Sequence, residues 1–207
     1  MKTNDVLKLF KNRTARHLEQ KENQNYAILL PIVEQNEALH VLFEVRAKNL
    51  IHQPGEICFP GGKVEEDDLT FLDAAIRETS EELGTDPQQI TDVYPLDYLV
   101  GSMTIYPFVG RLLDVKKINP SPDEVEEVFT IPLAYLLETQ PLVHPVDLTP
   151  TPAEDFPYEL IPGGRNYSWF SRKMTQYFYL YEDRVVWGLT ASILHHFLGV
   201  IKKNGLT

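Results

Sequence analysis

The chain of 207 residues is poor in cysteine, in long apolar stretches and in positive charge, and each shortage excludes a class of protein. It contains one cysteine, Cys58, which excludes an internal disulfide framework and is typical of a cytosolic protein. No stretch approaches the roughly 18 consecutive apolar residues of a membrane-spanning helix. The first twenty residues lack the apolar block of a secretory signal. We therefore expect a cytoplasmic location and no membrane partner.

Positive charge is scarce as well. The 19 Lys and Arg residues stand against 30 Asp and Glu, which gives a formal net charge of -11. Because no long basic run exists, binding of nucleic acid through a broad basic face is not expected. An acidic protein can still bind an anionic substrate when divalent metal ions neutralise both partners.

The composition that remains, 43% hydrophobic and 24% charged, is that of a globular protein. Without an internal repeat or an obvious linker, one domain over residues 1–207 is predicted, with an N-terminal helix at about 4–19. Residues 141–165 hold six of the fifteen prolines and are expected to be long and irregular. Strand-like runs lie at 26–33, 39–46, 92–100, 103–114, 124–131, 167–170 and 175–187, with helices near 133–138 and 189–202. This interleaving predicts an α/β protein, a mixed β-sheet sandwiched between helices.

The clearest helix is predicted over residues 70–84. Thr70 and Asp73 form a variant of a capping box at its start, and Gly84 stands where a C-cap glycine belongs. At about 100° per residue, four residues should share the stripe that faces the core: Leu72, Ile76, Thr79 and Leu83.

Three glutamates of this helix, Glu78, Glu81 and Glu82, stand at i, i+3 and i+4 and should share a different face. Carboxylates so close together repel one another and raise each other's pKa, and a bound divalent cation removes that penalty. Oxygen ligands favour Mg²⁺ first and Mn²⁺ second. A solvated acidic helix face is the alternative, and the helix alone does not decide between the two.

A glycine-rich loop precedes the helix, with the sequence FPGG at 59–62 and RETSEELG at 77–84. Together, over about residues 62–84, they resemble the Nudix box, in which a glycine loop leads into a helix bearing REuxEExG, where u is apolar. The chain departs from the usual box in three ways. Asp68 stands where a glutamate is expected, eight residues rather than seven separate it from Arg77, and Thr79 and Thr85 replace commoner aliphatic residues.

Residues 42–62, LFEVRAKNLIHQPGEICFPGG, are similar to a second signature, L-L-T-x-R-x-x-x-L-x-H-x-x-G-x-x-x-F-P-G-G. That signature belongs to the Nudix subfamily that hydrolyses coenzyme A, whose box also has the extra residue and often an aspartate. Arg46, His52 and Gly55 fall in register, whereas Glu44 replaces the usual threonine and Ile51 a common arginine. The resemblance continues past the box and covers about residues 25 to 200.

The resemblance implies the Nudix fold and metal-dependent hydrolysis of the diphosphate bond of coenzyme A to 3′,5′-ADP and 4′-phosphopantetheine. It also implies that Glu78, Glu81, Glu82 and the backbone carbonyl of Gly62 hold Mg²⁺ or Mn²⁺, and that Arg77 pairs with a box carboxylate. Two alternatives stay open. One is hydrolysis of another nucleoside diphosphate derivative, such as ADP-ribose or a dinucleoside polyphosphate, and the other is a non-catalytic Nudix-fold binding module.

The general base and the substrate contacts are less firmly indicated. Glu124 is the candidate base, with Glu127 second, and an ordinary acidic loop is the alternative. Arg46, His52 and Lys63 are the candidate substrate contacts. A surface ion pair for Arg46 and a loop anchor for His52 are the competing interpretations, and nothing in the spacing selects Lys63 over three other basic residues: Lys48, Arg165 and Arg172. The sequence leaves open whether the chain is a homodimer and whether free, acylated or oxidised coenzyme A is preferred.

Overall fold

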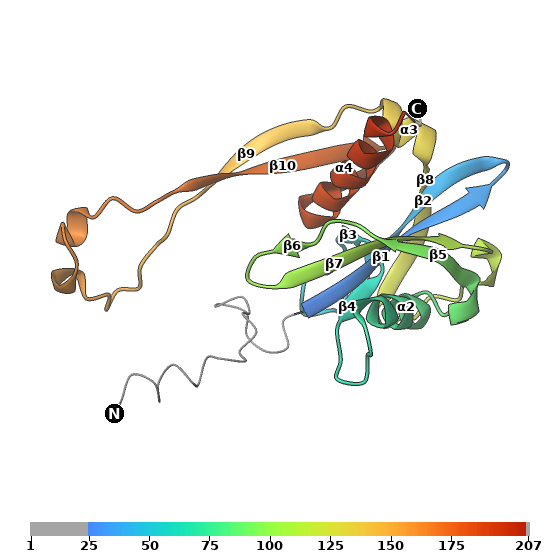
Figure 1. The fold of residues 1–207 in the computed structure, drawn as a ribbon, viewed down its shortest axis with the longest axis horizontal. Helices are drawn as coiled ribbons and strands as arrows, with labels where there is room; N and C mark the ends of the chain where they lie inside the picture. Colours follow the sequence, from blue (N-terminus) through green and yellow to red (C-terminus); the bar gives the residue numbers. More distant parts are fainter. Residues whose placement is uncertain (1–24, 206–207) are drawn as a thin grey trace, which may run out of the picture. The chain divides into compact units, whose positions relative to one another are not determined.

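The computed structural model describes residues 25–205, which fall into two compact units (Figure 1). The first unit contains residues 25–30 and 60–121, and the second contains 31–59 and 122–205. The helix predicted at about 4–19 lies outside the described residues, and the single domain stays a prediction. Within residues 25–205 no helix has the length and apolar character needed to cross a membrane.

The regular elements agree with most of the predicted ranges. In chain order they are β1 (Asn25–Gln35), β2 (Ala38–Arg46), β3 (Ile57–Cys58), β4 (Gly61–Lys63), α2 (Phe71–Glu82), β5 (Ile90–Pro95), β6 (Leu99–Val100), β7 (Thr104–Leu112), β8 (Val125–Pro132), α3 (Leu133–Glu138), β9 (Leu142–Leu148), β10 (Arg172–Tyr181), β11 (Arg184–Trp187) and α4 (Gly188–Lys203). Short 3₁₀ turns lie at Pro87–Gln89, Val115–Lys117, Tyr158–Leu160 and Gly164–Asn166.

The first unit is a sheet carrying α2. The start of β1 pairs with β4 in antiparallel register, Ala27 opposite Gly62, and β7 lies between β1 and β5. Helix α2 packs on the sheet through two small residues, Ala74 and Ala75, which are fully buried with Ala27. Small side chains let the helix approach the strand closely, and this close approach places the glycine loop beside the helix.

Both ends of α2 are fixed by hydrogen bonds. The Thr70 hydroxyl accepts from the Asp73 amide, as the predicted N-cap requires, and Gly84 adopts a left-handed φ of 57° at the C-terminus. Two backbone carbonyls of the last turn accept from a later segment: Leu83 from the Asn119 amide and Glu82 from the Ser121 amide, both at 2.9 Å. The predicted helix boundaries are therefore confirmed to within two residues.

The buried side of α2 is turned relative to the predicted stripe. Thr79 and Leu83 are buried as expected, but Leu72 and Ile76 are only half-buried. Glu82, expected on a separate polar face, is 7% exposed. The prediction was wrong here because helical spacing alone treats a carboxylate as an exposed polar group, whereas this one accepts a hydrogen bond from the glycine loop.

The second unit has its own sheet and core. The end of β1 forms the predicted hairpin with β2, through a turn at Asn36 and Glu37 with φ of 50° and 64°. Strand β2 pairs with β8 and, near its end, with β3. The Phe43 ring stacks on Phe59 and Phe129, with centroid distances of 5.0 and 5.5 Å. Phe43 and Phe59 are buried in the core of the second unit, and Phe129 is half-buried beside them.

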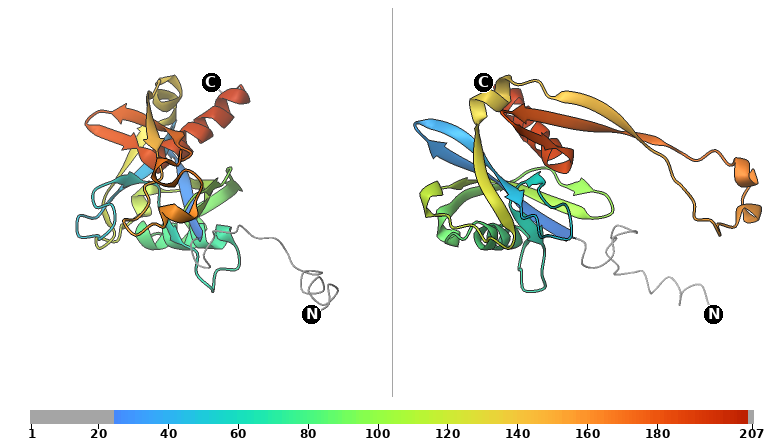
Figure 2. Two further views of the ribbon diagram at one scale, coloured as in Figure 1. Left: turned by 90° about the vertical axis from the view of Figure 1, so that its left-hand side faces the viewer. Right: turned by 180° about the vertical axis from the view of Figure 1, so that it is seen from behind.

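A long β-ribbon belongs to the second unit (Figures 1 and 2). Strands β9, β10 and β11 form a separate three-stranded antiparallel sheet with β10 in the middle. The expectation that residues 141–165 are irregular throughout was wrong, because Leu142–Leu148 pair with Arg172–Phe178. The strand predicted at 167–170 is absent, since regular pairing begins only at Arg172.

Candidate active site

The glycine loop lies directly against α2. The Gly61 amide donates a hydrogen bond to the Glu82 carboxylate at 2.6 Å. Gly61 has a φ of 146°, which an L side chain rarely adopts. A Cβ on Gly62 would lie well inside van der Waals distance of the Glu78 carboxyl group. Glycine is therefore required at both positions, one for backbone conformation and one for space.

Arg77 holds several box carboxylates together. Its guanidinium donates two hydrogen bonds to Asp68, from Nε at 3.0 Å and from Nη2 at 2.9 Å. Its Nη1 lies 3.0 Å from a Glu78 oxygen and 3.2 Å from a Glu81 oxygen. A further hydrogen bond reaches the Lys63 carbonyl at 3.1 Å. The arginine thus ties the loop, the aspartate and the helix into one network, and the pairing with a box carboxylate that the motif implied is present.

This network changes the acidity of its members. Hydrogen bonds from Arg77 hold the pKa of Asp68 below its usual range, and the Asp68 side chain is only 6% exposed. The hydrogen bond to Asp68, followed by the charge of Glu78, raises the pKa of Arg77. Arg77 and Asp68 are therefore a permanent ion pair at neutral pH, with Glu78 and Glu81 beside the positive charge.

The donor atoms of the box suit a hard divalent cation. Glu78 and Glu82 present carboxylates to the glycine loop, and Glu81, with a side chain 59% exposed, lies at the solvent edge. Because Gly62 has no Cβ, its backbone can lie beside the Glu78 carboxyl group. In the described part of the chain, no three His, Cys, Asp or Glu side chains converge as a ready metal cluster. Arg77 is the cation that contacts Glu78 and Glu81 in this arrangement.

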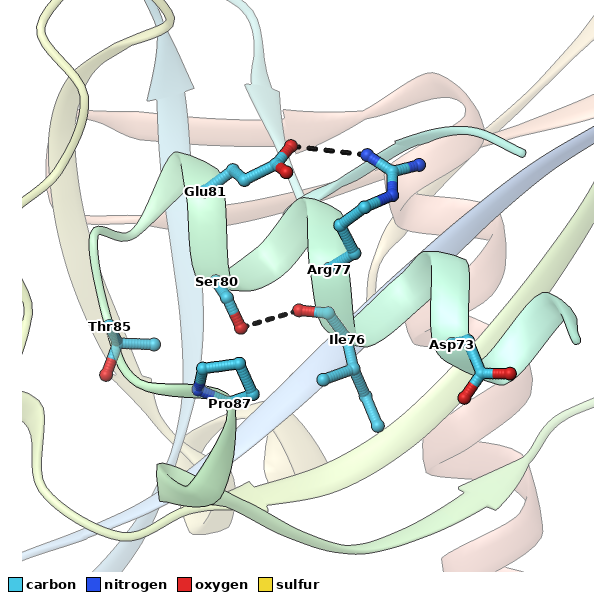
Figure 3. A pocket seen from close by; sticks show the side chains of 7 residues that line it. All are labelled: Asp73, Ile76, Arg77, Ser80, Glu81, Thr85 and Pro87. Atoms are coloured by element: carbon cyan, nitrogen blue, oxygen red, sulfur yellow. Dashed lines mark hydrogen bonds and ion pairs between the residues drawn. The ribbon is translucent and has the colours of Figure 1, made fainter. Parts of the chain in front are cut away.

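A cavity of about 440 Å³ runs along α2 (Figure 3). It is lined by Asp73, Ile76, Arg77, Ser80, Glu81, Thr85 and Pro87. Figure 3 shows Arg77 and Glu81 pointing toward one another at its edge, joined by the ion pair. Of the three box glutamates, Glu81 is the one that lines this hollow in the surface of the first unit.

The candidate substrate contacts Arg46 and His52 belong to the second unit. Arg46 ends β2, and its Nε donates to the backbone carbonyl of His52 at 3.3 Å. The Gly55 amide donates to the Arg46 carbonyl at 2.9 Å, and the Arg46 amide donates to the Glu56 carbonyl at the same distance. Arg46 therefore closes the 47–56 loop, and His52 takes part through its backbone. Lys63, in the first unit, is exposed.

The two base candidates differ in their surroundings. Glu124 is exposed, and its backbone carbonyl accepts from the Ala47 amide at 2.9 Å. Glu127 receives two hydrogen bonds from Arg184, at 2.7 and 3.0 Å. Those bonds lower the pKa of Glu127, which makes it a weaker base. Glu127 is therefore less suited to act as the base, and the role of Glu124 stays a prediction.

Sequence reasoning missed a buried acidic pair in the second unit. Glu44 is 1% exposed, and the Cys58 thiol donates to its Oε1 at 3.3 Å. Its Oε2 is buried without a hydrogen-bond partner among the described residues. Burial raises the pKa of Glu44 to about 7, with smaller opposing effects of Cys58 and Arg46. The signal was in the sequence: a glutamate between Phe43 and Val45 in an apolar strand.

The chain is similar to known proteins. The family model described as NUDIX domain matches residues 23–150. The chain belongs to the Nudix family. It is 37% identical over 120 residues to the mouse peroxisomal coenzyme A diphosphatase NUDT7, a match that covers 57% of this chain and 51% of that protein. To an uncharacterized Nudix hydrolase NudL of Salmonella paratyphi B it is 32% identical over 171 residues, 81% of this chain and 78% of that protein.

A solved structure has a similar fold. The crystal structure of a MutT/nudix family protein from Enterococcus faecalis matches with a TM-score of 0.50 at 13% identity, covering 98% of this chain and 70% of that one. The Nudix family and the α/β Nudix fold predicted from the box are therefore confirmed. The chain spans about half the length of the mouse and plant relatives that it matches.

Proposed function

We propose that this Nudix-family chain hydrolyses the diphosphate bond of coenzyme A or its derivatives to 3′,5′-ADP and 4′-phosphopantetheine, using Mg²⁺ or Mn²⁺. The observation that carries the proposal is the contact between the glycine loop and α2, in which Gly61 binds Glu82 and Gly62 touches Glu78. It brings hard oxygen donors of the helix beside the backbone of the glycine loop, and such donors suit a divalent cation that shares its ligand shell with a phosphate.

The residues that would hold the cation are Glu78, Glu81, Glu82 and the backbone carbonyl of Gly62. When bound, the cation supplies polarisation of phosphoryl oxygens and a lowered pKa for the attacking water. The chain's own contribution is positioning. The Gly61 amide fixes the Glu82 carboxylate, and Arg77 fixes Asp68 while it forms ion pairs with Glu78 and Glu81. Glu124 would accept the proton of the attacking water.

Two features support coenzyme A over other nucleoside diphosphates. Residues 42–62 match the coenzyme A signature at Arg46, His52 and Gly55, and the mouse relative bears the name of a coenzyme A diphosphatase. Arg46, His52 and Lys63 are the proposed substrate contacts, since a guanidinium and an ammonium both suit phosphate. The cytoplasm is the proposed location, on the strength of the single cysteine.

Coenzyme A is expected to be hydrolysed at least about 10-fold faster than ADP-ribose, in kcat/KM, with Mg²⁺ or Mn²⁺ present. The measurement is a panel of coenzyme A, its acyl and disulfide forms, ADP-ribose and a dinucleoside polyphosphate, with products identified by mass. Reactions with a chelator are the control. Equal rates on coenzyme A and ADP-ribose would contradict the substrate assignment, and binding of coenzyme A without turnover of any compound would favour a non-catalytic module.

Replacing Gly62 tests the contact between loop and helix. In Gly62→Ala the new methyl group collides with the Glu78 carboxyl group, so we expect metal-dependent turnover to fall about 10- to 100-fold, as when the support of a metal ligand is lost. The matched control is Gly199→Ala in α4, where an added Cβ meets nothing within 4 Å. Near-normal turnover by Gly62→Ala with an unchanged metal requirement would count against this geometry.

A further inference from the structure

The sheet of β9, β10 and β11 in the second unit has one covered face. The Tyr177 ring stacks on His195 of α4 at 3.9 Å, and the Tyr179 hydroxyl lies 2.8 Å from Nδ1 of the same histidine. Tyr181 contacts Tyr135 of α3. Because side chains alternate along a strand, the even-numbered residues of β10 point the other way.

That second side, here called the open face, is apolar. Strand register places on it Leu142, His144, Val146, Leu148, Arg172, Met174, Gln176, Phe178, Leu180, Val185 and Trp187. Six large apolar side chains are 40% to 52% exposed: Leu142, Val146, Met174, Leu180, Val185 and Trp187. The covered side also has one exposed aliphatic residue, Val143 at 53%, but otherwise exposes mainly Pro145, Asp147, Lys173 and Thr175. Contiguous apolar exposure of this kind on a soluble protein is typical of an interaction surface.

We propose that the open face is the interface of a two-fold homodimer, in which the open faces of two copies pack on one another. The charges at its two ends are complementary. Arg172 lies at one end of β10, and the acidic pair Glu182 and Asp183 forms the turn at the other end, about 33 Å away for ten residues of strand. A two-fold axis near Phe178 places Arg172 of each copy against the acidic turn of the other.

The ribbon itself favours packing of faces over pairing of edges. Strand β9 is the edge of the sheet next to most of β10, and it carries Pro145 in its centre, which has no amide to donate to a further strand. Beyond β11 only β9 and β10 remain, and a two-stranded ribbon alone is marginally stable in water. Packing of a second copy on the open face would therefore stabilise it. Eleven residues on three strands form a small interface by the standard of about 800 Å² per partner, and we expect a dissociation constant in the micromolar range.

Sedimentation equilibrium of the full chain, from about 1 to 100 μM, tests the proposal. The wild type is expected to be a dimer at the upper end of this range. Met174→Glu places a charge in the open face and should weaken dimerisation at least about 30-fold. Thr175→Glu makes the same change one residue along, on the other side of the ribbon, and should leave the dissociation constant unchanged.

Exchanging the two charges of the proposed contact distinguishes a weakened interface from a folding defect. Arg172→Glu and Asp183→Lys should each weaken the dimer, and the double variant should recover part of the loss, because each charge then faces its opposite again. A wild type that remains a monomer at about 100 μM would overturn the proposal. So would a dimer that Met174→Glu and Thr175→Glu leave equally intact. Neither readout depends on hydrolysis, so the proposed activity and this interface succeed or fail separately.

Discussion

Glu82→Gln is expected to lower metal-dependent turnover by about 100-fold or more while leaving the fold intact. The amide oxygen of glutamine can still accept the hydrogen bond from the Gly61 amide, so the contact between loop and helix is retained. What is lost is the negative charge that the proposed metal site requires. Glu82 is 7% exposed, so the substitution removes this charge from a buried position in the site.

The measurement is the rate of coenzyme A hydrolysis against Mg²⁺ concentration, together with the urea midpoint of each variant. Glu66→Gln, an exposed glutamate in the loop before α2, is the matched control and should behave as the wild type. If Glu82→Gln retained near-normal turnover at moderate Mg²⁺, the assignment of this carboxylate as a ligand would be lost. If its urea midpoint fell steeply, Glu82 would be a structural residue first.

Glu44→Gln is expected to stabilise the protein at pH 8 by up to about 3 kcal/mol, because a shift from 4.5 to about 7 corresponds to that free energy. The native state holds a proton on Glu44 up to about pH 7, since burial opposes ionisation. The unfolded chain releases that proton near pH 4.5. Stability of the wild type therefore falls as the pH rises from about 4.5 to 7, and then stays level.

The difference between wild type and Glu44→Gln should vanish below about pH 4.5 and grow through that window. Urea unfolding at a series of pH values from 4 to 8.5 measures it. Glu138→Gln, on the exposed side of α3, makes the same chemical change at the surface and should show no such growth. Parallel curves for wild type and Glu44→Gln would mean that Glu44 ionises as easily in the folded protein as in the unfolded chain.

Much of the fold and of the Nudix box could be predicted from local signals in the sequence. Thr70 and Gly84 delimit α2 because a cap is decided within four residues of the helix end. The hairpin of β1 and β2 is local in the same sense, since its turn needs only two residues with positive φ. The residues of the box, together with the resemblance to the Nudix family, were sufficient to predict the family.

Contacts between distant residues were not predictable from such signals. Strand β9 was missed because its proline argues against a strand, and its partner β10 lies more than twenty residues away. The burial of Glu82 depends on a backbone amide 21 residues earlier, at Gly61. The ion pair that weakens Glu127 as a base joins residues 57 apart in the chain. In each case the deciding partner is brought close only by the completed fold.

The C-terminal turn of α2 has a further consequence for dynamics. Helix ends usually fray on fast timescales, because their last carbonyls lack partners. Here Asn119 and Ser121 supply donors to Leu83 and Glu82, so opening the turn also requires detachment of a segment some 36 residues downstream. Glu81 and Glu82 are thus carried by a helix end that opens only cooperatively, and amide hydrogen exchange there should report the same opening as that of residues 119–121.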